Sequence, residues 1–430
     1  MSTDPRDPGA HLPPTVDPVL LRGLTSSRIG RRDVLRLFGA AGGAAVLAGC
    51  GGIAAQGKKT NTSKSAVQKY WSKQKETGQL VWANWPLYLD TKGKSDHPSL
   101  DQFQKQTGIQ VKYVEAVQDN GPFFAKVQPT LSSGQYCGFD VAVISSGIYF
   151  NKFRDLGFVV PLDQDRLTNF RKYAGQKYQH ESFDPGNVYS VPWQAGFTGI
   201  GYNPEKTGKE IKSWSDLNDP KLKGHIGLFA NNEDLPNCAL LAIGVDPLKS
   251  TPADWRKAAD WLDRLKPLVR NFYSQSYINA LATGDLWVSM AWSGDIFQQN
   301  LSGKEIGQKL KFVIPQEGGL LWTDNFLILK GAQNPVSAMK LMDFYYQPNV
   351  AAEVTEWVNY ISPVPQAQQV VEQHAQAAKG GDRKYLDAVA HSYATFPQQS
   401  VYDQTTIGYT PRAGKDLDTW NSIFEPVYQS

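Results

Sequence analysis

Residues 78–83 read GQLVWA, residues 109–114 read IQVKYV and residues 139–144 read FDVAVI, and these three apolar segments decide the fold class. The middle segment alternates apolar and polar residues, which indicates a half-buried strand. The last is almost continuously apolar, which is typical of a strand covered on both faces. Residues 99–106 have a helical repeat that stops at Gly108, so strands and helices alternate. That alternation predicts an α/β domain with a largely parallel sheet.

The same alternation returns in the second half of the chain. Residues 224–229 and 287–292 are predicted strands, and residues 252–265 are predicted to form an amphipathic helix. Asn334 and Pro335 mark the start of another helix, because proline is favoured at the first helical position. Its apolar stripe is predicted to be core and comprises Ala338, Leu341, Met342 and Tyr345. A chain of 430 residues, of which 41% are hydrophobic, is long enough for two such domains.

The N-terminal segment predicts export rather than a folded element. Arg31 and Arg32 precede an apolar run, residues 37–48, which is far shorter than the ~20 residues of a membrane-spanning helix. A pair of arginines followed by a short apolar run is typical of a twin-arginine signal peptide. Residues 1–49 are therefore predicted to be this signal, and the protein is expected on the extracytoplasmic side of the cell membrane, periplasmic or facing a cell wall.

The end of the signal predicts a lipid anchor. Residues 47–50 read LAGC and resemble a bacterial lipobox, so Cys50 is predicted to be the lipidated first residue of the mature chain. Residues 50–65 are rich in small and polar residues and are predicted to be a flexible tether. The other two cysteines, Cys137 and Cys238, show no spacing that supports a disulfide and are expected to be free thiols.

Composition and motifs argue against several functions. Residues 1–49 hold six arginines and four aspartates, and subtracting their net +2 from the total of +3 leaves +1. No basic stripe remains, so nucleic acid is not an expected partner. The sequence has no His-Glu-x-x-His, Gly-x-Ser-x-Gly, phosphate-loop or Cys-x-x-Cys motif, and its six histidines lack metal-ligand spacing. We therefore expect no catalysis, no metal and no cofactor.

Seven short motifs follow one another between Gly78 and Pro363. They are Asn84-Trp85-x-x-Tyr88; Phe139-Asp140-Val141 with Ser145; residues 189–193 (YSVPW) with 199–203 (GIGYN); Trp214-Ser215-Asp216-Leu217; Trp292-Ser293-Gly294-Asp295; residues 315–319 (PQEGG) with Trp322-Thr323-Asp324; and Asn359-Tyr360-x-x-Pro363. In this order they resemble the bacterial spermidine/putrescine-binding proteins, a branch of the type II solute-binding fold of ABC importers.

The resemblance implies a two-lobed α/β fold with two crossover segments and a ligand cleft between the lobes. Residues 66–197 and 322–377 are expected to form lobe 1, and residues 198–321 and 378–430 lobe 2. The implied function is that of a lipid-anchored solute-binding subunit that delivers a polyamine or related small amine, such as putrescine or spermidine, to a membrane permease. The expected partners are the permease and ATPase subunits of the importer, and the expected state is a monomer.

The resemblance also implies the residues of the ligand site. An ammonium group in a closed cleft needs an acidic partner, and an aromatic face beside it contributes ~0.5–2 kcal/mol. By similarity, Asp324 is the principal carboxylate, Asp234 a second one and Ser145 a hydroxyl contact. The aromatic walls implied by the same motifs are Trp85, Tyr88, Trp292, Trp322 and Tyr360.

Two departures from the family pattern bear on the ligand. Leu87 and Asn231 stand where the family has acids, and Asn231 is kept as a candidate contact; Glu233 lies close enough to substitute. An ammonium without a carboxylate partner is strongly unfavourable in a closed cleft. The sequence therefore predicts one firmly held cationic nitrogen, as in putrescine, another short amine or a zwitterion, rather than spermidine. Gln404 is a candidate for a C-terminal contact.

Other functions remain open at this level. The same fold could bind a sugar or oligosaccharide, because aromatic faces also stack on sugar rings. A ferric-ion binder would need an adjacent tyrosine pair with a supporting histidine, which the sequence lacks. A lipid-anchored cell-wall hydrolase would need two opposed acids, a part that Asp234 and Asp324 could play. A surface lipoprotein without a ligand would leave a cleft with five aromatic residues unexplained.

Overall fold

The computed structural model describes residues 62–92, 96–301, 309–407, 409–410 and 412–429. The predicted signal peptide, Cys50 and residues 50–61 of the predicted tether therefore lie outside the described residues. The predicted tether is too long at its far end, because helix α3 (Lys64–Trp71) begins inside it. This helix is fixed by Trp71, which is 2% exposed and donates its indole N–H to the carbonyl of Pro161 at 2.9 Å.

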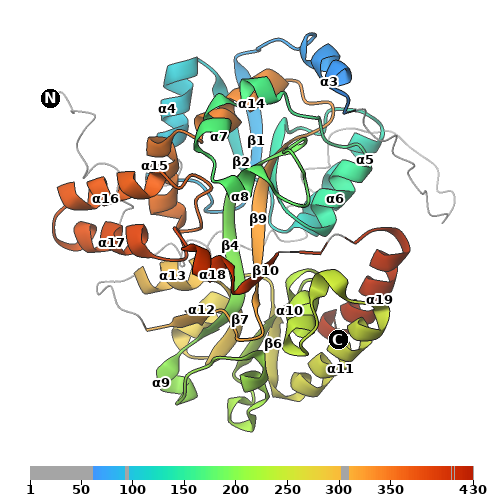
Figure 1. The fold of residues 1–430 in the computed structure, drawn as a ribbon, viewed down its shortest axis with the longest axis vertical. Coiled ribbons are helices and arrows are strands. Elements are labelled where there is room, and N and C mark those ends of the chain that lie inside the picture. Colours follow the sequence, from blue (N-terminus) through green and yellow to red (C-terminus); the bar gives the residue numbers. More distant parts are fainter. Residues whose placement is uncertain (1–61, 93–95, 302–308, 408, 411, 430) are drawn as a thin grey trace, which may run out of the picture.

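Within the described residues, ten strands form one sheet that runs through both lobes (Figure 1). Their order is β2-β1-β3-β9-β4-β7-β5-β6, with β10 paired to β9 and β8 to β4. The strands are β1 (Gln79–Asn84), β2 (Gln110–Glu115), β3 (Val141–Ser145), β4 (Ser190–Tyr202), β5 (Ile226–Phe229), β6 (Val269–Tyr273), β7 (Val288–Trp292), β8 (Lys311–Val313), β9 (Gly319–Ile328) and β10 (Thr405–Ile407).

The outer strands confirm the prediction of parallel α/β sheets. In lobe 1, β1 pairs in parallel with both β2 and β3, and in lobe 2, β5 does so with β6 and β7. Every strand and helix predicted above is present, and helix α11 spans Pro252–Leu265 as predicted. Helix α4 (Pro98–Thr107) ends at Gly108, whose φ of 73° closes it in the left-handed conformation that glycine adopts without strain.

Strands β4 and β9 form the two crossovers between the lobes. They run antiparallel, from the pair Ser190–Leu327 in lobe 1 to the pair Thr198–Leu320 in lobe 2. At one end β9 pairs with β3, and at the other β4 pairs with β7. The expected lobe boundaries, 197/198 and 321/322, therefore fall inside these strands, so both lobes share a central two-stranded ribbon (Figure 1).

Helices surround this sheet in each lobe. Besides α3, α4 and α11 they are α5 (Asn120–Ser132), α6 (Ile148–Asp155), α7 (Thr168–Tyr173), α8 (Gln176–Gln179), α9 (Pro204–Thr207), α10 (Asp234–Ala242), α12 (Tyr277–Thr283), α13 (Ser293–Leu301), α14 (Pro335–Phe344), α15 (Pro348–Val358), α16 (Ala367–Ala377), α17 (Gly380–His391), α18 (Gln399–Tyr402) and α19 (Gly414–Gln429). The four residues predicted as the core stripe of α14 and its C-cap are all buried. They share one cluster with Leu80 and Phe103, so lobe 1 combines early and late parts of the chain.

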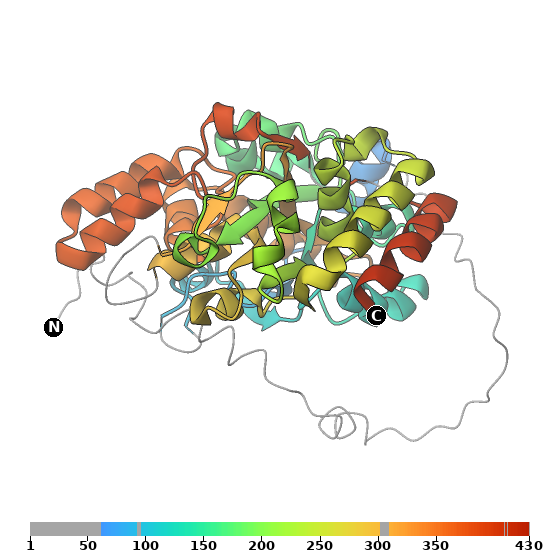
Figure 2. The same cartoon turned by 90° about the horizontal axis from the view of Figure 1, so that it is seen from below.

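The expected boundary at 377/378 is wrong for helix α17. Its Leu386 and Val389 are buried in the lobe 1 cluster, together with Val371 of α16. A two-residue connection folds α17 back on α16, and the pair projects from one side of the molecule (Figure 2). The C-terminal helix α19 does pack on lobe 2, where Trp420 meets Trp255 of α11 with 5.2 Å between ring centroids.

Two further predictions concern single features. Cys137 and Cys238 are free thiols, as expected, the first half-buried and the second buried in α10. No helix in the part of the chain that the structure describes is both long and apolar enough to cross a membrane.

Candidate ligand-binding site

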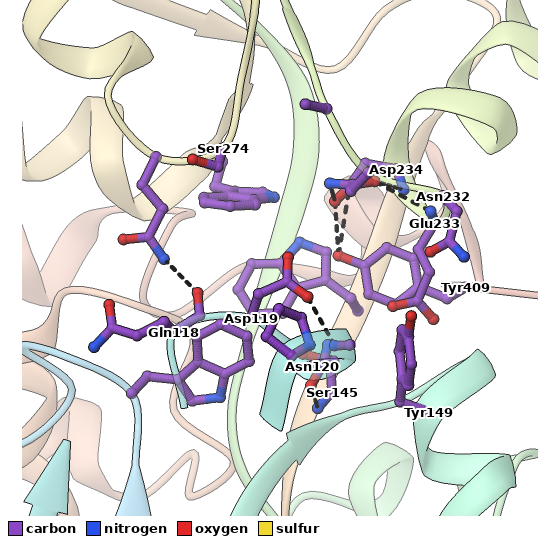
Figure 3. A pocket seen from close by; sticks show the side chains of 18 of the residues that line it. Gln118, Asp119, Asn120, Ser145, Tyr149, Asn232, Glu233, Asp234, Ser274 and Tyr409 are labelled. Atoms are coloured by element: carbon purple, nitrogen blue, oxygen red, sulfur yellow. Dashed lines mark hydrogen bonds between the residues drawn. The ribbon is translucent and has the colours of Figure 1, made fainter. Parts of the chain in front are cut away.

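A cavity of about 250 Å³ lies between the lobes, beside the crossover strand β9. Both lobes and the C-terminal segment contribute to its walls (Figure 3). All nine residues predicted to contact a ligand line this cavity: Trp85, Tyr88, Ser145, Asn231, Asp234, Trp292, Trp322, Asp324 and Tyr360. The sequence motifs that carry them are far apart in the chain, and the fold brings them together.

Asp324 lies at the centre of the lobe 1 wall. It stands on β9 opposite Ser145, the last residue of β3, in the antiparallel ladder. The hydroxyl of Ser145 donates to Asp324 Oδ1 at 2.5 Å, and that of Tyr88 donates to Oδ2 at 2.8 Å. Asp324 is only 6% exposed, and burial raises its pKa to about 6 against the opposing effect of the two hydroxyls, with a further increase from Asp234. The two hydroxyls therefore fix the orientation of the carboxylate, but no lysine, arginine or histidine of the lining neutralises its charge.

Asp234 is the corresponding acid of lobe 2 and the first residue of α10, where the helix dipole favours a negative charge. Its carboxylate accepts hydrogen bonds from Thr198 Oγ1 at 2.6 Å, Asn231 Nδ2 at 2.9 Å and the Tyr409 hydroxyl at 3.1 Å. It is 2% exposed, and burial raises its pKa to about 6 although these three donors oppose the shift. Two buried acids with raised pKa values therefore face one cavity.

Asn231 holds this acid in place. Its Oδ1 accepts the backbone N–H groups of Glu233 at 3.1 Å and of Asp234 at 2.6 Å, while its Nδ2 donates to the Asp234 carboxylate. Both polar atoms of the Asn231 amide therefore hold the backbone and the carboxylate at the start of α10 in place. The side chain lines the cavity, but its hydrogen bonds in this structure are all made to the protein.

The aromatic walls are fixed through their polar atoms. Trp85 Nε1 donates to a backbone carbonyl of β3 at 3.1 Å, and Trp322 Nε1 donates to Thr198 Oγ1 at 3.1 Å. The Tyr360 hydroxyl donates to Asp295 Oδ1 at 2.7 Å, behind the cavity wall. Because these groups are satisfied within the protein, the ring faces are left to face the ligand.

Trp292 closes the wall on the lobe 2 side. It ends β7 and packs on Phe229 with 4.6 Å between ring centroids. Tyr88, Tyr360 and Trp322 form a continuous array on the lobe 1 side, with centroid separations of 5.7 and 5.5 Å. Aromatic residues therefore flank the two acids from both lobes.

The lining holds three acids besides Asp234 and Asp324. Glu233 before α10 is the residue named from sequence as a possible substitute, whereas Asp119 at the start of α5 and Glu425 on α19 are not among the predicted contacts. With Asp234 and Asp324 the lining thus holds five acidic residues and no lysine, arginine or histidine. Figure 3 shows Glu233, Asp234 and Tyr409 together on one side of the cavity, away from Gln118 and Ser274. The negative potential that these acids create in the cavity attracts a cation.

Two expectations about single residues are wrong. Gln404 donates its Nε2 to the carbonyl of Ser400 and does not line the cavity; Tyr409, Glu425 and Tyr428 are the C-terminal residues that line it. Leu87 does not line the cavity either, because it takes a left-handed conformation with φ of 54° and its N–H donates to Glu115 at 2.9 Å. A leucine at this position therefore does not place an apolar side chain against a ligand.

No group of three or more His, Cys, Asp and Glu side chains in the described residues is arranged to hold a metal ion. A cavity between two lobes, joined by two crossing strands and lined by acids and aromatic rings, defines a two-lobed ligand-binding protein. The model of one protein family, described as bacterial extracellular solute-binding protein, matches residues 99–381. The chain belongs to this family, which confirms the resemblance found in its sequence.

Individual relatives agree with the family. The chain is 33% identical to the spermidine/putrescine-binding periplasmic protein of Salmonella typhimurium over 66% of this chain and 77% of the relative. It is 30% identical to the putrescine/cadaverine-binding protein of Pseudomonas aeruginosa, over 66% and 79%. A solved structure described as a putative spermidine/putrescine ABC transporter from Listeria monocytogenes has a TM-score of 0.68 and 26% identity, covering 82% of this chain and 99% of that chain. The Salmonella and Pseudomonas relatives are named as binding proteins, which agrees with the prediction that this chain is not an enzyme.

Proposed function

We propose that the protein is the solute-binding subunit of an ABC importer and that it binds a polyamine or related small amine in the interlobe cavity. The observation that carries this proposal is the lining, with five acidic residues, no basic residue and aromatic rings from both lobes. The names of the Salmonella and Pseudomonas relatives, which bind such amines, support the same ligand class.

The physics of the lining favours an alkyl-ammonium ion over a neutral solute. Taking an ammonium group out of water costs several kcal/mol unless a carboxylate receives it. Asp324 and Asp234 are proposed to receive the ammonium, with Ser145 and Asn231 holding these acids in position. The rings of Trp85, Tyr88, Trp292, Trp322 and Tyr360 are proposed to cover the methylene groups and the charge, adding ~0.5–2 kcal/mol per good cation–π contact.

Ligand binding is proposed to close the lobes by rotation about the β4–β9 ribbon. Direct contacts between the lobes support this motion, since Gln275 Nε2 donates to the carbonyl of Gln118 at 3.2 Å and Ile148 N donates to Glu233 Oε1 at 2.7 Å. A ligand that touches both walls shifts the population towards this closed form. The closed protein would then dock, as a monomer, on the membrane permease, which works with the ATPase subunits of the importer.

Amine affinity is expected to fall as the pH drops through about 6. The carboxyls of Asp324 and Asp234 have pKa values of about 6 in the empty cavity, so protons compete with a cation below that pH. At pH 5 each carboxyl involved lowers the affinity by about tenfold relative to pH 8. Calorimetric titration of the purified protein with putrescine, butylamine and maltose at pH 8, 6 and 5 checks this, with circular dichroism to confirm that the fold persists at pH 5.

Two outcomes would contradict the amine proposal. Saturable binding of maltose without pH dependence, together with no response to either amine, would favour the sugar-binding alternative on the same fold. Amine binding that is equally strong at pH 5 and pH 8 would show that the buried acids do not hold the ligand.

We also propose that Arg31 and Arg32 direct twin-arginine export and that Cys50 carries a lipid. Replacing Cys50 by Ala should move the exported protein from the membrane fraction to the soluble extracytoplasmic fraction, with amine binding unchanged, because the anchor lies outside the folded lobes. Cell fractionation and immunoblotting measure this. Cys137→Ala is the matched control and should stay with the membrane; a Cys50→Ala protein that also stays there would refute the anchor.

A further inference from the structure

Glu233 is a buried acid with one oxygen in use and one open. It is 6% exposed, lines the cavity and precedes the first residue of α10 without capping that helix through its side chain. Its Oε1 instead accepts the N–H of Ile148, the first residue of α6 in the opposite lobe, at 2.7 Å. Its Oε2 accepts no hydrogen bond from any residue that the structure describes. This oxygen is not among the buried polar atoms that lack a partner, so it is open to the cavity, where an N–H group of a ligand can reach it.

Gly147 creates the space that Glu233 uses. Its φ is 119°, and a Cβ atom added there would lie 2.4 Å from Glu233 Oε1 and 2.4 Å from the Cβ of Tyr409. Any other residue at 147 would therefore exclude both side chains from their present places. The acid from lobe 2 reaches the start of α6 because this position has no side chain.

The charges around Glu233 leave it without a counter-ion on the cavity side. Asp234 on its own helix and Asp119 on α5 are acids, and Lys152 on α6 is the cation that acts on it, although Lys152 does not line the cavity. Tyr149 of α6 and Tyr409 of the C-terminal segment complete the surroundings. Burial, together with the two acids, raises the pKa of Glu233 well above its usual range, against the effects of Ile148 N–H and Lys152.

The other two unassigned acids are less suited to hold a buried cation. Asp119 is exposed and already accepts the N–H of Gly121 at 2.7 Å. Glu425 is half-buried at one rim of the cavity on α19. Solvent screens both, whereas Glu233 is almost fully withdrawn from water.

We propose that Glu233 determines specificity by receiving a second ammonium group on Oε2 while its Oε1 holds lobe 1 through Ile148, so that a diamine closes the protein better than a monoamine. This inference rests on the proposed amine-binding function, in which Asp324 and Asp234 receive the first ammonium. It replaces the expectation from sequence of a single firmly held nitrogen and takes up the other possibility raised there, that Glu233 substitutes for an acid that the family has and this chain lacks.

The test compares putrescine with butylamine, which has the same four-carbon chain and one charge. The wild-type protein should bind putrescine at least tenfold more tightly than butylamine in calorimetric titration at pH 8. Glu233→Gln keeps an oxygen for Ile148 N–H but removes the charge, so it should lower putrescine affinity at least tenfold and leave butylamine affinity within about twofold. Asp119→Asn and Glu425→Gln change the other two unassigned acids of the same lining, so they are comparisons rather than neutral controls. Affinity for both amines can fall in these variants, but the ratio between the two amines should stay at its wild-type value.

Proton release gives a second readout. Burial raises the pKa of Glu233 well above its usual range, and an ammonium on Oε2 needs the ionised carboxylate. Putrescine should therefore release more protons on binding than butylamine does, seen as a larger difference in binding enthalpy between buffers of different ionisation heat. Glu233→Gln should remove this difference between the two amines. Glu233→Asp, which keeps the charge but shortens the reach to Ile148, should weaken both ligands. Thermal melts of each variant show whether it is folded, so that a loss of binding is not a loss of structure.

The possible results distinguish a failure of the role proposed for Glu233 from a failure of the proposed amine-binding function. Equal wild-type affinities for putrescine and butylamine, or a ratio that changes in Asp119→Asn or Glu425→Gln instead of Glu233→Gln, would overturn the role of Glu233 and leave amine binding intact. No binding of either amine by the wild-type protein would overturn the proposed function itself.

Discussion

Replacing Asp324 by Asn is expected to reduce amine affinity by about a hundredfold or more, because removing one partner of a buried charge pair costs about 2–5 kcal/mol. The amide cannot neutralise an ammonium, yet it fits the same space and can still accept from the hydroxyl of Ser145 or Tyr88, whose distances to the carboxylate are now 2.5 and 2.8 Å. Calorimetric titration with putrescine measures the loss. Wild-type affinity in this variant would remove Asp324 from the site.

The same substitution should stabilise the ligand-free protein at pH 7. The pKa of Asp324 is raised from 3.8 to about 6 by folding, so the native state holds its proton more tightly than the unfolded chain does. Stability is therefore lost as the pH rises from about 4 through 6, and above that the ionised group opposes folding by up to about 3 kcal/mol. The neutral amide of the Asp324→Asn variant has no such penalty, so thermal melts should show a midpoint several degrees higher at pH 7 and little difference at pH 4.

A buried acid outside the cavity is the control for both effects. Asp295 accepts the hydroxyls of Tyr277 at 2.9 Å and Tyr360 at 2.7 Å and does not line the cavity. Asp295→Asn should keep amine affinity within about tenfold, since it removes no charge from the ligand site. A loss equal to that of Asp324→Asn would mean that packing rather than charge governs binding.

Replacing Gly147 by Ala is expected to lower amine affinity by about a hundredfold or more by preventing lobe closure. The new Cβ would lie 2.4 Å from Glu233 Oε1 and from Tyr409 Cβ, and the φ of 119° adds backbone strain of ~1–3 kcal/mol. The clash exists only when the lobes are together, so the open form is favoured. Small-angle scattering with saturating putrescine should show the compaction of the wild-type protein and none in the variant.

Gly138→Ala is the matched control for this substitution. Gly138 has a φ of 94°, but a Cβ there would meet nothing within 4 Å. It therefore imposes backbone strain without a steric clash, and its amine affinity should equal that of the wild-type protein. If Gly147→Ala binds putrescine as tightly as Gly138→Ala does, the contact between Gly147 and lobe 2 is not part of the bound state.

Much of the fold could be predicted from periodicity, because strands and helices bury one face or two in recognisable patterns. Helix α11 was bounded by Pro252 and the end of its apolar stripe at Leu265, both of which are local signals. The placement of α17 is different. Leu386 and Val389 mark an apolar face, but which lobe covers that face depends on the direction of the turn after α16, which no local pattern encodes.

In the candidate site, too, some residues could be predicted from the sequence and others depend on the tertiary fold. The resemblance predicted nine lining residues, seven of them inside the quoted motifs, while Asn231 and Asp234 were placed by their position relative to the acids of the family. Glu233 and Tyr409 gain their positions only when the lobes come together at Gly147, a contact between segments that share no motif. The position of Leu87 outside the lining, between Pro86 and Tyr88 that both line the cavity, goes with a left-handed backbone conformation (φ of 54°) that the spacing of a motif does not encode.

The ribbon of β4 and β9 that both lobes share also determines when lobe 1 can complete its folding during synthesis of the chain. Lobe 1 lacks β9, one of the two strands beside β3, until residues 319–328 have been synthesised, and the hydrogen bond between Ser145 and Asp324 joins residues 179 positions apart. Pairing at such separation is slow compared with local helix formation. A nascent chain threaded across a membrane as it emerges would face this step outside the cytoplasm, whereas a twin-arginine signal would allow both lobes to finish folding, with cytoplasmic chaperones at hand, before transport begins.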